Sequence, residues 1–382
     1  MIGSKELIRD LNSHFILEQI LLDGPISRAA LSKSSGLSKA TVSAIVQELL
    51  QQKLIVEIGN DDTSMGRKPI LLAFQASCGH VLSIDVNAST ISAMTCNLQG
   101  QNCQLKLYPN QAGREEILPL LVSIIRDRME KLSETPFGLI GIGLGIHGSV
   151  HENQVIFSPY SPYEKLPFHQ VLEETFQVPV YLENEANLSA IGEHTFCYHV
   201  PNLVGISIHA GIGTGMIIQN ALYTGFNGNA GEFGHTIIEL NGRPCPCGNQ
   251  GCLEQYASER AILKEYTLRT GCEQSIDTFV EACNRQEPAA LSLLEEFVLY
   301  MSVGINNILN SINPDMIVIN SSFTTYFPQV LTHIQERLQT PMGRHCQLVP
   351  SGLQDTSILL GAACVCIQNF LGIEHLKLHP EP

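Results

Sequence analysis

The chain has 382 residues, 44% of them hydrophobic and 15% charged, and a formal net charge of −15. This is the composition of an ordinary soluble globular protein with room for two or three lobes. The polar start lacks the apolar segment of a signal peptide, and no run approaches the roughly 18 uninterrupted apolar residues that a membrane span needs.

The 12 cysteines do not indicate a disulfide framework, because outside one cluster at residues 245–252 they are scattered over a long chain. Cys78, Cys96, Cys364 and Cys366 lie in apolar sequence, where a reduced cysteine acts as a small hydrophobic residue. We therefore expect reduced thiols and a cytoplasmic protein.

Helical spacing of apolar residues predicts three helices in the first 52 residues. The first helix is expected to end at Gly24-Pro25, Ser27 is placed to cap the second helix, and Ser38 is placed to cap the third. Gly36 falls at the tight turn between the second and third helices. This is the spacing of a helix-turn-helix.

Two apolar runs follow, at residues 54–58 and 70–74, and they predict the β-hairpin of a winged helix. Residues 1–75 hold eight basic and eight acidic residues, whereas the rest of the chain holds 14 basic and 29 acidic residues. An acidic body repels DNA, so any DNA contact must come from this neutral N-terminal part.

The third helix is expected to enter the major groove, and the wing to reach a phosphate or a narrow minor groove. The residues predicted to contact double-stranded DNA are Ser38, Lys39, Thr41, Ser43, Gln47, Arg67 and Lys68. A three-helix module that binds protein instead of DNA remains the alternative.

Strand and helix patterns alternate from residue 81 onward, which predicts α/β architecture. A strand-rich start at residues 81–107 precedes a helix at about 114–132, and a similar start recurs at residue 203. This recurrence predicts two similar lobes. Long helices near 288–312 and 355–370 would complete the second lobe.

One compact loop carries four potential metal ligands, namely His235, Cys245, Cys247 and Cys252. Three thiols and one imidazole form the ligand set of a closed, four-coordinate structural zinc site. The prolines and glycines between the cysteines supply tight turns. The alternative is a surface loop that carries free cysteines.

The run GEFGH, followed by CPCGNQGCLEQYAS, resembles the zinc segment of the ROK family of repressors and sugar kinases, and residues 206–235 are similar to the signature of that family. The resemblance implies a two-lobed actin-like/sugar-kinase fold. It places a winged helix-turn-helix domain at residues 1–75, lobe 1 at 76–198, and lobe 2 at 199–382 with its zinc segment at 235–252. The C-terminal helix is expected to pack back on lobe 1.

The nucleotide elements of ROK kinases are altered in this sequence. Both glycines of the first phosphate turn are replaced in the run 85–89, at Asn87 and Ala88, and Asn-Ser-Ser at 320–322 stands where a Gly-Gly pair is expected. Bare backbone is needed for close approach to phosphate, so these changes argue against ATP. The loop 210–215 keeps its glycines.

Glu185 stands at the position of the catalytic aspartate, and its longer side chain would misplace a general base. Glu185 is therefore a vestigial base position, no catalytic residue is assigned, and we expect the chain not to be an enzyme. A sugar kinase that retains ATP-dependent activity remains an alternative.

The sugar-binding residues of the family match polar residues that persist here. They are Gly148, Asn184, Glu185, Glu232, His235 and Glu254. The resemblance, closest to the xylose-repressor branch, implies a repressor whose monosaccharide effector, xylose or glucose-like, changes its affinity for operator DNA. It further implies a homodimer or a dimer of dimers. Control by a transport-system partner protein instead of a sugar remains open.

Overall fold

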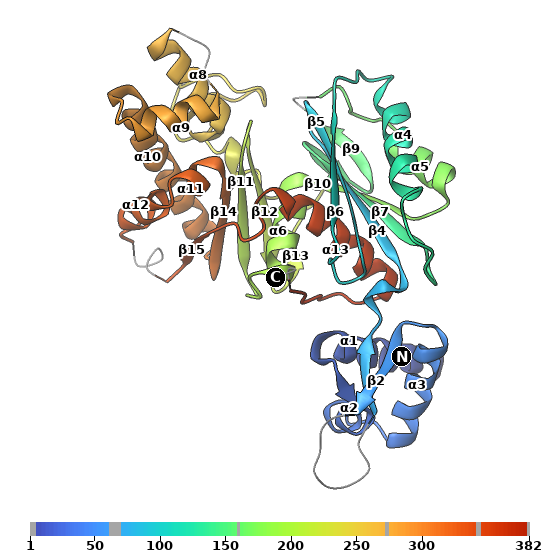
Figure 1. The fold of residues 1–382 in the computed structure, drawn as a ribbon. Coiled ribbons are helices and arrows are strands. Elements are labelled where there is room, and N and C mark those ends of the chain that lie inside the picture. Colours follow the sequence, from blue (N-terminus) through green and yellow to red (C-terminus); the bar gives the residue numbers. More distant parts are fainter. Residues whose placement is uncertain (1–4, 61–69, 159–160, 272–274, 341–344, 380–382) are drawn as a thin grey trace.

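The computed structural model describes residues 5–60, 70–158, 161–271, 275–340 and 345–379. A small N-terminal domain lies beside one of two lobes, each of which is built on a five-stranded sheet (Figure 1). Two helices, α6 (Glu185–Phe196) and α13 (Ser357–Leu371), pack against each other and against these sheets.

The N-terminal domain is a winged helix, as the sequence predicts. Ser27 accepts a hydrogen bond from Ala30 N at 3.2 Å, and Ser38 accepts one from Thr41 N at 3.1 Å, so both predicted caps are present. Gly36 has φ +69°, which a residue with a side chain adopts only with strain. The elements are α1 (Lys5–Asp23), β1 (Ile26–Ser27), α2 (Arg28–Ser35), α3 (Lys39–Gln51), β2 (Ile55–Asn60) and β3 (Ile70–Phe74).

Lobe 1 holds a mixed sheet in the order β10-β7-β4-β5-β6. Strands β4, β5 and β6 form an antiparallel meander, whereas β7 and β10 run parallel to β4. The elements are η1 (Ala76–Cys78), β4 (His80–Val86), β5 (Thr90–Cys96), β6 (Gln104–Pro109), α4 (Ile117–Met129), β7 (Leu139–Ile146), β8 (Ser149–His151), β9 (Gln154–Phe157), α5 (Phe168–Phe176), β10 (Val180–Asn184) and α6.

Lobe 2 repeats this topology in the order β13-β12-β11-β14-β15, again with three antiparallel strands followed by two parallel ones. The predicted pair of similar lobes is therefore confirmed. The elements are β11 (Leu203–Ile208), β12 (Ile212–Ile218), β13 (Ala221–Leu222), η2 (Phe233–His235), α7 (Glu254–Ala257), α8 (Glu259–Thr270), α9 (Ile276–Asn284), α10 (Pro288–Ser311), β14 (Met316–Ser321), α11 (Ser322–Tyr326), α12 (Gln329–Arg337), β15 (Gln347–Pro350), η3 (Gln354–Thr356) and α13.

Glycines allow α6 to approach its neighbours closely. A Cβ atom on Gly361 of α13 would lie 1.8 Å from Leu188 O of α6, and a Cβ on Gly215 of β12 would lie 2.4 Å from Ala186 O. Helix α13 also lies on lobe 1, where a Cβ on Gly143 would be 2.7 Å from Ala362 O. A displacement of α6 must therefore be transmitted to α13, because neither helix has free space at these crossings.

Among the described residues one helix, α10, is long and apolar enough by length and composition to cross a membrane. Its residues Phe297, Met301 and Ile305 are buried in the core of lobe 2. This is the placement of a core helix in a globular domain.

Candidate metal centre and ligand cleft

The four predicted metal ligands converge. His235, Cys245, Cys247 and Cys252 each offer one ligand atom, and these four atoms all lie within 4.8 Å of one another. Cys247 Sγ and Cys252 Sγ are 3.7 Å apart, and Cys245 Sγ is 3.5 Å from His235 Nδ1. Tetrahedral zinc with bonds of about 2.3 Å to sulfur places two sulfurs about 3.8 Å apart, so the spacing fits this ion.

The backbone of the metal loop is held by its own turns. Cys245 N donates to Asn249 O at 2.9 Å, and Gly251 N donates to Arg243 O at 2.8 Å. Gly251 has φ +83°, and a Cβ atom there would lie 1.8 Å from Glu239 O. Only glycine fits this position, so the loop shape does not depend on the cysteines alone.

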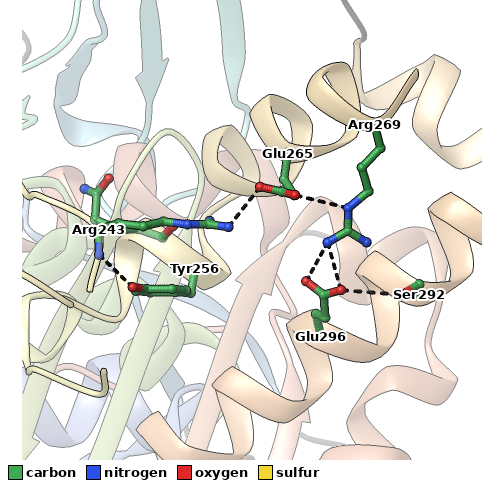
Figure 2. Close-up of polar contacts among 7 residues, drawn as sticks. Arg243, Tyr256, Glu265, Arg269, Ser292 and Glu296 are labelled. Carbon is green, nitrogen blue, oxygen red and sulfur yellow. Dashed lines mark hydrogen bonds and ion pairs between the residues drawn. The ribbon is translucent and has the colours of Figure 1, made fainter. Parts of the chain in front are cut away.

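Arg243 ties the loop to the helices of lobe 2 (Figure 2). Its backbone N–H donates to the Tyr256 hydroxyl at 2.7 Å, and its guanidinium donates to Glu265 at 2.9 Å. Glu265 also accepts from Arg269, which in turn forms two hydrogen bonds with Glu296 of α10. The metal loop therefore has a polar anchor that is separate from the ligands.

His235 has a different neighbour on each ring nitrogen. Nδ1 faces Cys245, whereas Nε2 lies 3.7 Å from Glu232 Oε2. Glu254 is buried beside the same group, with Oε1 3.2 Å from Cys245 Sγ and 2.8 Å from Gln255 Nε2. A metal held through Nδ1 would leave Nε2 directed at Glu232.

The carboxyl ends of the parallel strands β4, β7 and β10 bring a second polar group together. Asp85 near the end of β4 accepts a hydrogen bond from His147 Nε2, just after β7, at 2.9 Å. Burial lowers the pKa of His147, but the neighbouring Asp85 carboxylate has the larger effect in the opposite direction, so the pKa is raised to about 9. Neither residue belongs to the sites predicted from the sequence, because their meeting depends on the parallel pairing of β4 with β7.

Glu185 begins α6 at the same edge. Burial, together with the charges of Asp85 and Glu232, raises its pKa to about 7, although nearby His147 acts in the opposite direction. Its Oε2 atom is buried and has no hydrogen-bond partner among the described residues. Lobe 2 contacts Glu185 through Gly213, whose Cβ would lie 2.7 Å from Glu185 Oε1.

Asn184, which is predicted to bind sugar, caps α6 in the structure. Its side-chain oxygen caps α6 by accepting from Ala186 N at 2.9 Å and Asn187 N at 3.1 Å, and its amide donates to Gly148 O at 2.9 Å. Gly148 in turn packs on the β8–β9 hairpin, where a Cβ would lie 2.3 Å from Phe157 O. Asn184 thus fixes the start of α6 relative to the Gly148 loop.

The second lobe closes on this group. Burial raises the pKa of Glu232, whereas His235 and, from lobe 1, Ser149 oppose this rise. His209, at the end of β11, has its pKa lowered by burial and by His147 across the lobes. We name Asp85, His147, Glu185, His209, Glu232 and His235 the interlobe site.

Comparisons with known proteins agree with this architecture. The ROK family profile matches residues 81–369, and a winged helix-turn-helix DNA-binding profile matches residues 10–56. The chain belongs to the ROK family. A xylose repressor from Bacillus spizizenii is 35% identical over 380 residues, which cover 97% of this chain and 99% of the relative.

Other ROK proteins extend the comparison. The DNA-binding transcriptional dual regulator NagC of Escherichia coli is 27% identical over 357 residues, or 89% of this chain and 87% of NagC. A solved ROK transcriptional regulator, a homologue of the E. coli MLC protein, has TM-score 0.81 and 26% identity, and covers 95% of this chain and 96% of its own. A Streptomyces griseus ROK glucokinase solved with glucose and AMPPNP shares the fold, with TM-score 0.66 and 24% identity over 75% of this chain and 99% of the kinase.

The residues expected at the positions of the ROK nucleotide elements form contacts within the chain. Asn320 donates to Gln354 O and to the Ser357 hydroxyl, both at 3.1 Å, and Ser322 donates to Glu259 at 3.2 Å. In the glycine-rich loop, Gly213 and Gly215 face α6 rather than open space. These glycines are therefore explained by helix packing.

The predicted DNA-contacting residues lie on the N-terminal winged helix. Lys39, Ser43 and Gln47 are exposed along α3. The hydroxyl groups of Ser38 and Thr41 are hydrogen bonded to each other at 2.9 Å as part of the helix cap, which leaves them fewer hydrogen bonds to offer DNA. Arg67 and Lys68 lie outside the described residues.

Proposed function

We propose that the chain is a sugar-responsive DNA-binding repressor of carbohydrate-utilisation genes, acting in the cytoplasm. The observation that carries the proposal is Glu185, a buried carboxylate with an uncommitted oxygen at the meeting point of the two lobes. A buried polar atom without a partner is costly, and a ligand hydroxyl would satisfy it.

A neutral monosaccharide fits the chemistry of the interlobe site. Carboxylates at Glu185 and Glu232 accept hydrogen bonds from hydroxyl groups, and the imidazole of His235 directs Nε2 to the same region. Xylose is the first candidate because several similar proteins are xylose repressors, and glucose is the second. Of the other predicted sugar-contacting residues, Gly148 and Asn184 would shape the site and Glu254 would support His235.

We propose that phosphoryl transfer is lost. Asn87 and Ala88 replace glycines in the first phosphate turn, Asn320 is hydrogen bonded where bare backbone is needed, and His147 is paired with Asp85. An assay with ATP and xylose or glucose is expected to show no turnover above background, and clear sugar phosphate formation would contradict this.

The metal centre would hold one zinc ion through His235, Cys245, Cys247 and Cys252. Zinc bound to these residues would supply a closed structural cross-link and no reaction step. By holding Nδ1 it would fix the tautomer and orientation of His235, so that Nε2 faces the interlobe site.

DNA recognition is assigned to the exposed face of α3. Lys39, Ser43 and Gln47 are placed to contact the major groove, with Arg67 and Lys68 proposed for the wing. A homodimer, or a dimer of dimers, would present paired winged helices to a palindromic operator.

The fold suggests how sugar alters DNA binding. Helix α6 begins at Asn184 and Glu185, crosses α13 at Gly361, and α13 ends at Gly372. The His14 ring of α1 lies against Gly372, since a Cβ there would be 2.8 Å from the ring. A sugar that moves α6 would therefore move the end of α13 against the DNA-binding domain, which couples the two sites.

His14→Ala is expected to weaken this coupling. Because His14 is exposed and contacts neither site, sugar affinity and sugar-free operator affinity should each change by less than about threefold. The ratio of operator affinities without and with sugar should fall about threefold or more. Fluorescence anisotropy measures all three quantities. His333→Ala, an exposed histidine on α12, is the matched control, and an unchanged ratio in His14→Ala would exclude the route.

Sugar affinity is expected to rise with pH through about 7, the pKa of Glu185. Only the ionised carboxylate offers charge-assisted acceptors to sugar hydroxyls, and it predominates above that pKa, so affinity should level off at higher pH. Glu185→Gln should bind about tenfold more weakly above pH 7 and lose this pH dependence.

Isothermal titration of monosaccharides into zinc-loaded protein tests the proposal. Binding of xylose or glucose that weakens in Glu185→Gln would support it. If no sugar binds while operator binding is intact, the effector is a partner protein of a transport system or a phosphorylated sugar.

A further inference from the structure

A pocket of about 340 Å³ lies on lobe 2 beside the interlobe site. We name it the aromatic pocket. The residues that line it include two aromatic rings, two amides and one carboxylate, namely Tyr223, Phe226, Asn227, Asn229 and Glu232. Glu232 also belongs to the interlobe site, so the two share this carboxylate. The volume lies within the range of pockets that hold small ligands.

Strand β12 ties the aromatic pocket to Glu185. A Cβ atom on Gly213 of β12 would lie 2.7 Å from Glu185 Oε1. On the next residue of the strand, Thr214 O would lie 2.2 Å from a Cβ atom on Gly231, the residue before Glu232. Adjacent residues of one strand therefore contact Glu185 and the segment that carries Glu232.

The loop that carries Phe226 reaches from lobe 2 to lobe 1. Ala230 N donates to Thr224 O at 3.1 Å, which closes the loop. Gly228 has φ +80°, and a Cβ atom there would lie 2.3 Å from Val150 O of β8. The loop therefore spans the two lobes next to the shared carboxylate.

Phe226 is 98% exposed, the largest fraction among the large hydrophobic residues in the described part of the chain. A single exposed apolar side chain is ordinary and needs no explanation by itself. Phe226 differs because it borders a pocket that also offers amide and carboxylate groups. A ligand that fits both kinds of group presents apolar surface and hydroxyl groups within one small molecule.

We propose that Phe226 packs on one face of the monosaccharide ring and selects sugars by the direction of their hydroxyl groups. The inference rests on the proposed function, because it takes the ligand to be a sugar held by Glu185 and Glu232. A pyranose whose hydroxyls are all equatorial presents C–H groups on both faces, and an aromatic ring covers such a face favourably. An axial hydroxyl on the covered face would meet the ring without a hydrogen-bond partner, which is unfavourable.

The pyranose forms of xylose and glucose meet this condition, whereas their epimers do not. L-Arabinose carries an axial hydroxyl on one face of the ring, and ribose carries one on the other face. Whichever face Phe226 covers, one of these two pentoses should therefore bind more weakly than xylose. Galactose and allose are the corresponding pair if glucose binds instead.

Phe226→Ala is expected to weaken xylose binding about tenfold, because the variant lacks the apolar surface that the sugar covers. The disfavoured pentose gains little from the ring in the native protein, so the preference for xylose over it should fall about fivefold or more. Isothermal titration measures both affinities. The exposed position leaves the fold intact, and Leu268→Ala, exposed on α8, should change neither affinity.

Fluorescence gives a second readout, because the chain contains no tryptophan. In Phe226→Trp, xylose or glucose should change the emission over the concentrations at which it binds, whereas the emission of Leu268→Trp should stay constant. Operator DNA selected from a random library with the native protein gives a third. Phe226→Ala should bind it within about twofold of native affinity without sugar, and should respond only at about tenfold higher sugar concentration.

Three results would overturn the inference. They are unchanged sugar affinity in Phe226→Ala, an equal loss for xylose and both of its epimers, and constant emission from Phe226→Trp during titration with a sugar that binds. If the native protein binds no monosaccharide in the same titrations, the proposed function fails and the inference fails with it.

Discussion

Cys247→Ser is expected to abolish the metal centre and, with it, sugar binding. Zinc content should fall from about one ion per chain to near zero, because three remaining ligands no longer close a four-coordinate site. Cys247 is half-buried, so the serine itself costs little packing, and the effect comes through the metal. Loss of a cross-link in lobe 2 should lower the thermal midpoint by roughly 5–10 °C.

Loss of zinc is expected to affect sugar binding and operator binding differently. Without zinc the His235 ring is no longer held, so sugar affinity should fall about tenfold or more. Sugar-free operator binding should stay within about threefold, because the winged helix contacts lobe 1 and the end of α13. Cys103→Ser, an exposed thiol outside the cluster, is the control. Metal analysis, thermal melts and titration check these results, and normal zinc content in Cys247→Ser would refute the site.

Lys39→Glu is expected to weaken operator binding by about 10- to 100-fold, since it replaces an attractive charge with a repulsive one at the DNA surface. Lys39 is exposed in the first turn of α3, where a negative charge favours the helix dipole. The substitution should therefore leave the fold intact. If Lys39 contacts a phosphate, the slope of log affinity against log salt should also fall by about 0.9.

The control for this experiment is Lys264→Glu, which makes the same charge change at an exposed position on α8. It should alter operator affinity by less than about twofold, because charges beyond the Debye length are screened. Electrophoretic mobility shifts over a salt series compare both variants. Unchanged binding by Lys39→Glu would favour the alternative in which the three-helix module binds protein.

Features set by neighbouring residues could be predicted from the sequence. The helix caps at Ser27 and Ser38 each depend on one hydroxyl group and on the next few residues. The metal cluster depends on ligands that lie within one loop. The start of α6 at Asn184 and Glu185 follows from the same short-range logic. The helix expected at about 114–132 is shorter, Ile117–Met129, because helix ends depend on capping and tertiary contacts.

Features set by strand register could not be predicted. Asp85 and His147 are 62 residues apart and meet because β4 pairs in parallel with β7. Glu193 of α6 likewise accepts hydrogen bonds from Ser351, Gly352 and Leu353, more than 150 residues away. The 210–215 loop keeps the glycines expected of the ROK family, but their packing against α6 depends on how the lobes meet.

Control of DNA binding by sugar is tested most directly by titrating xylose, then glucose, into the complex of zinc-loaded protein with its selected operator and following anisotropy. We predict that one of these sugars binds and changes operator affinity about tenfold or more, and that Glu185→Gln shifts the response to higher sugar concentration. A sugar that binds at the interlobe site yet leaves operator affinity unchanged, or no response to any monosaccharide, would contradict it.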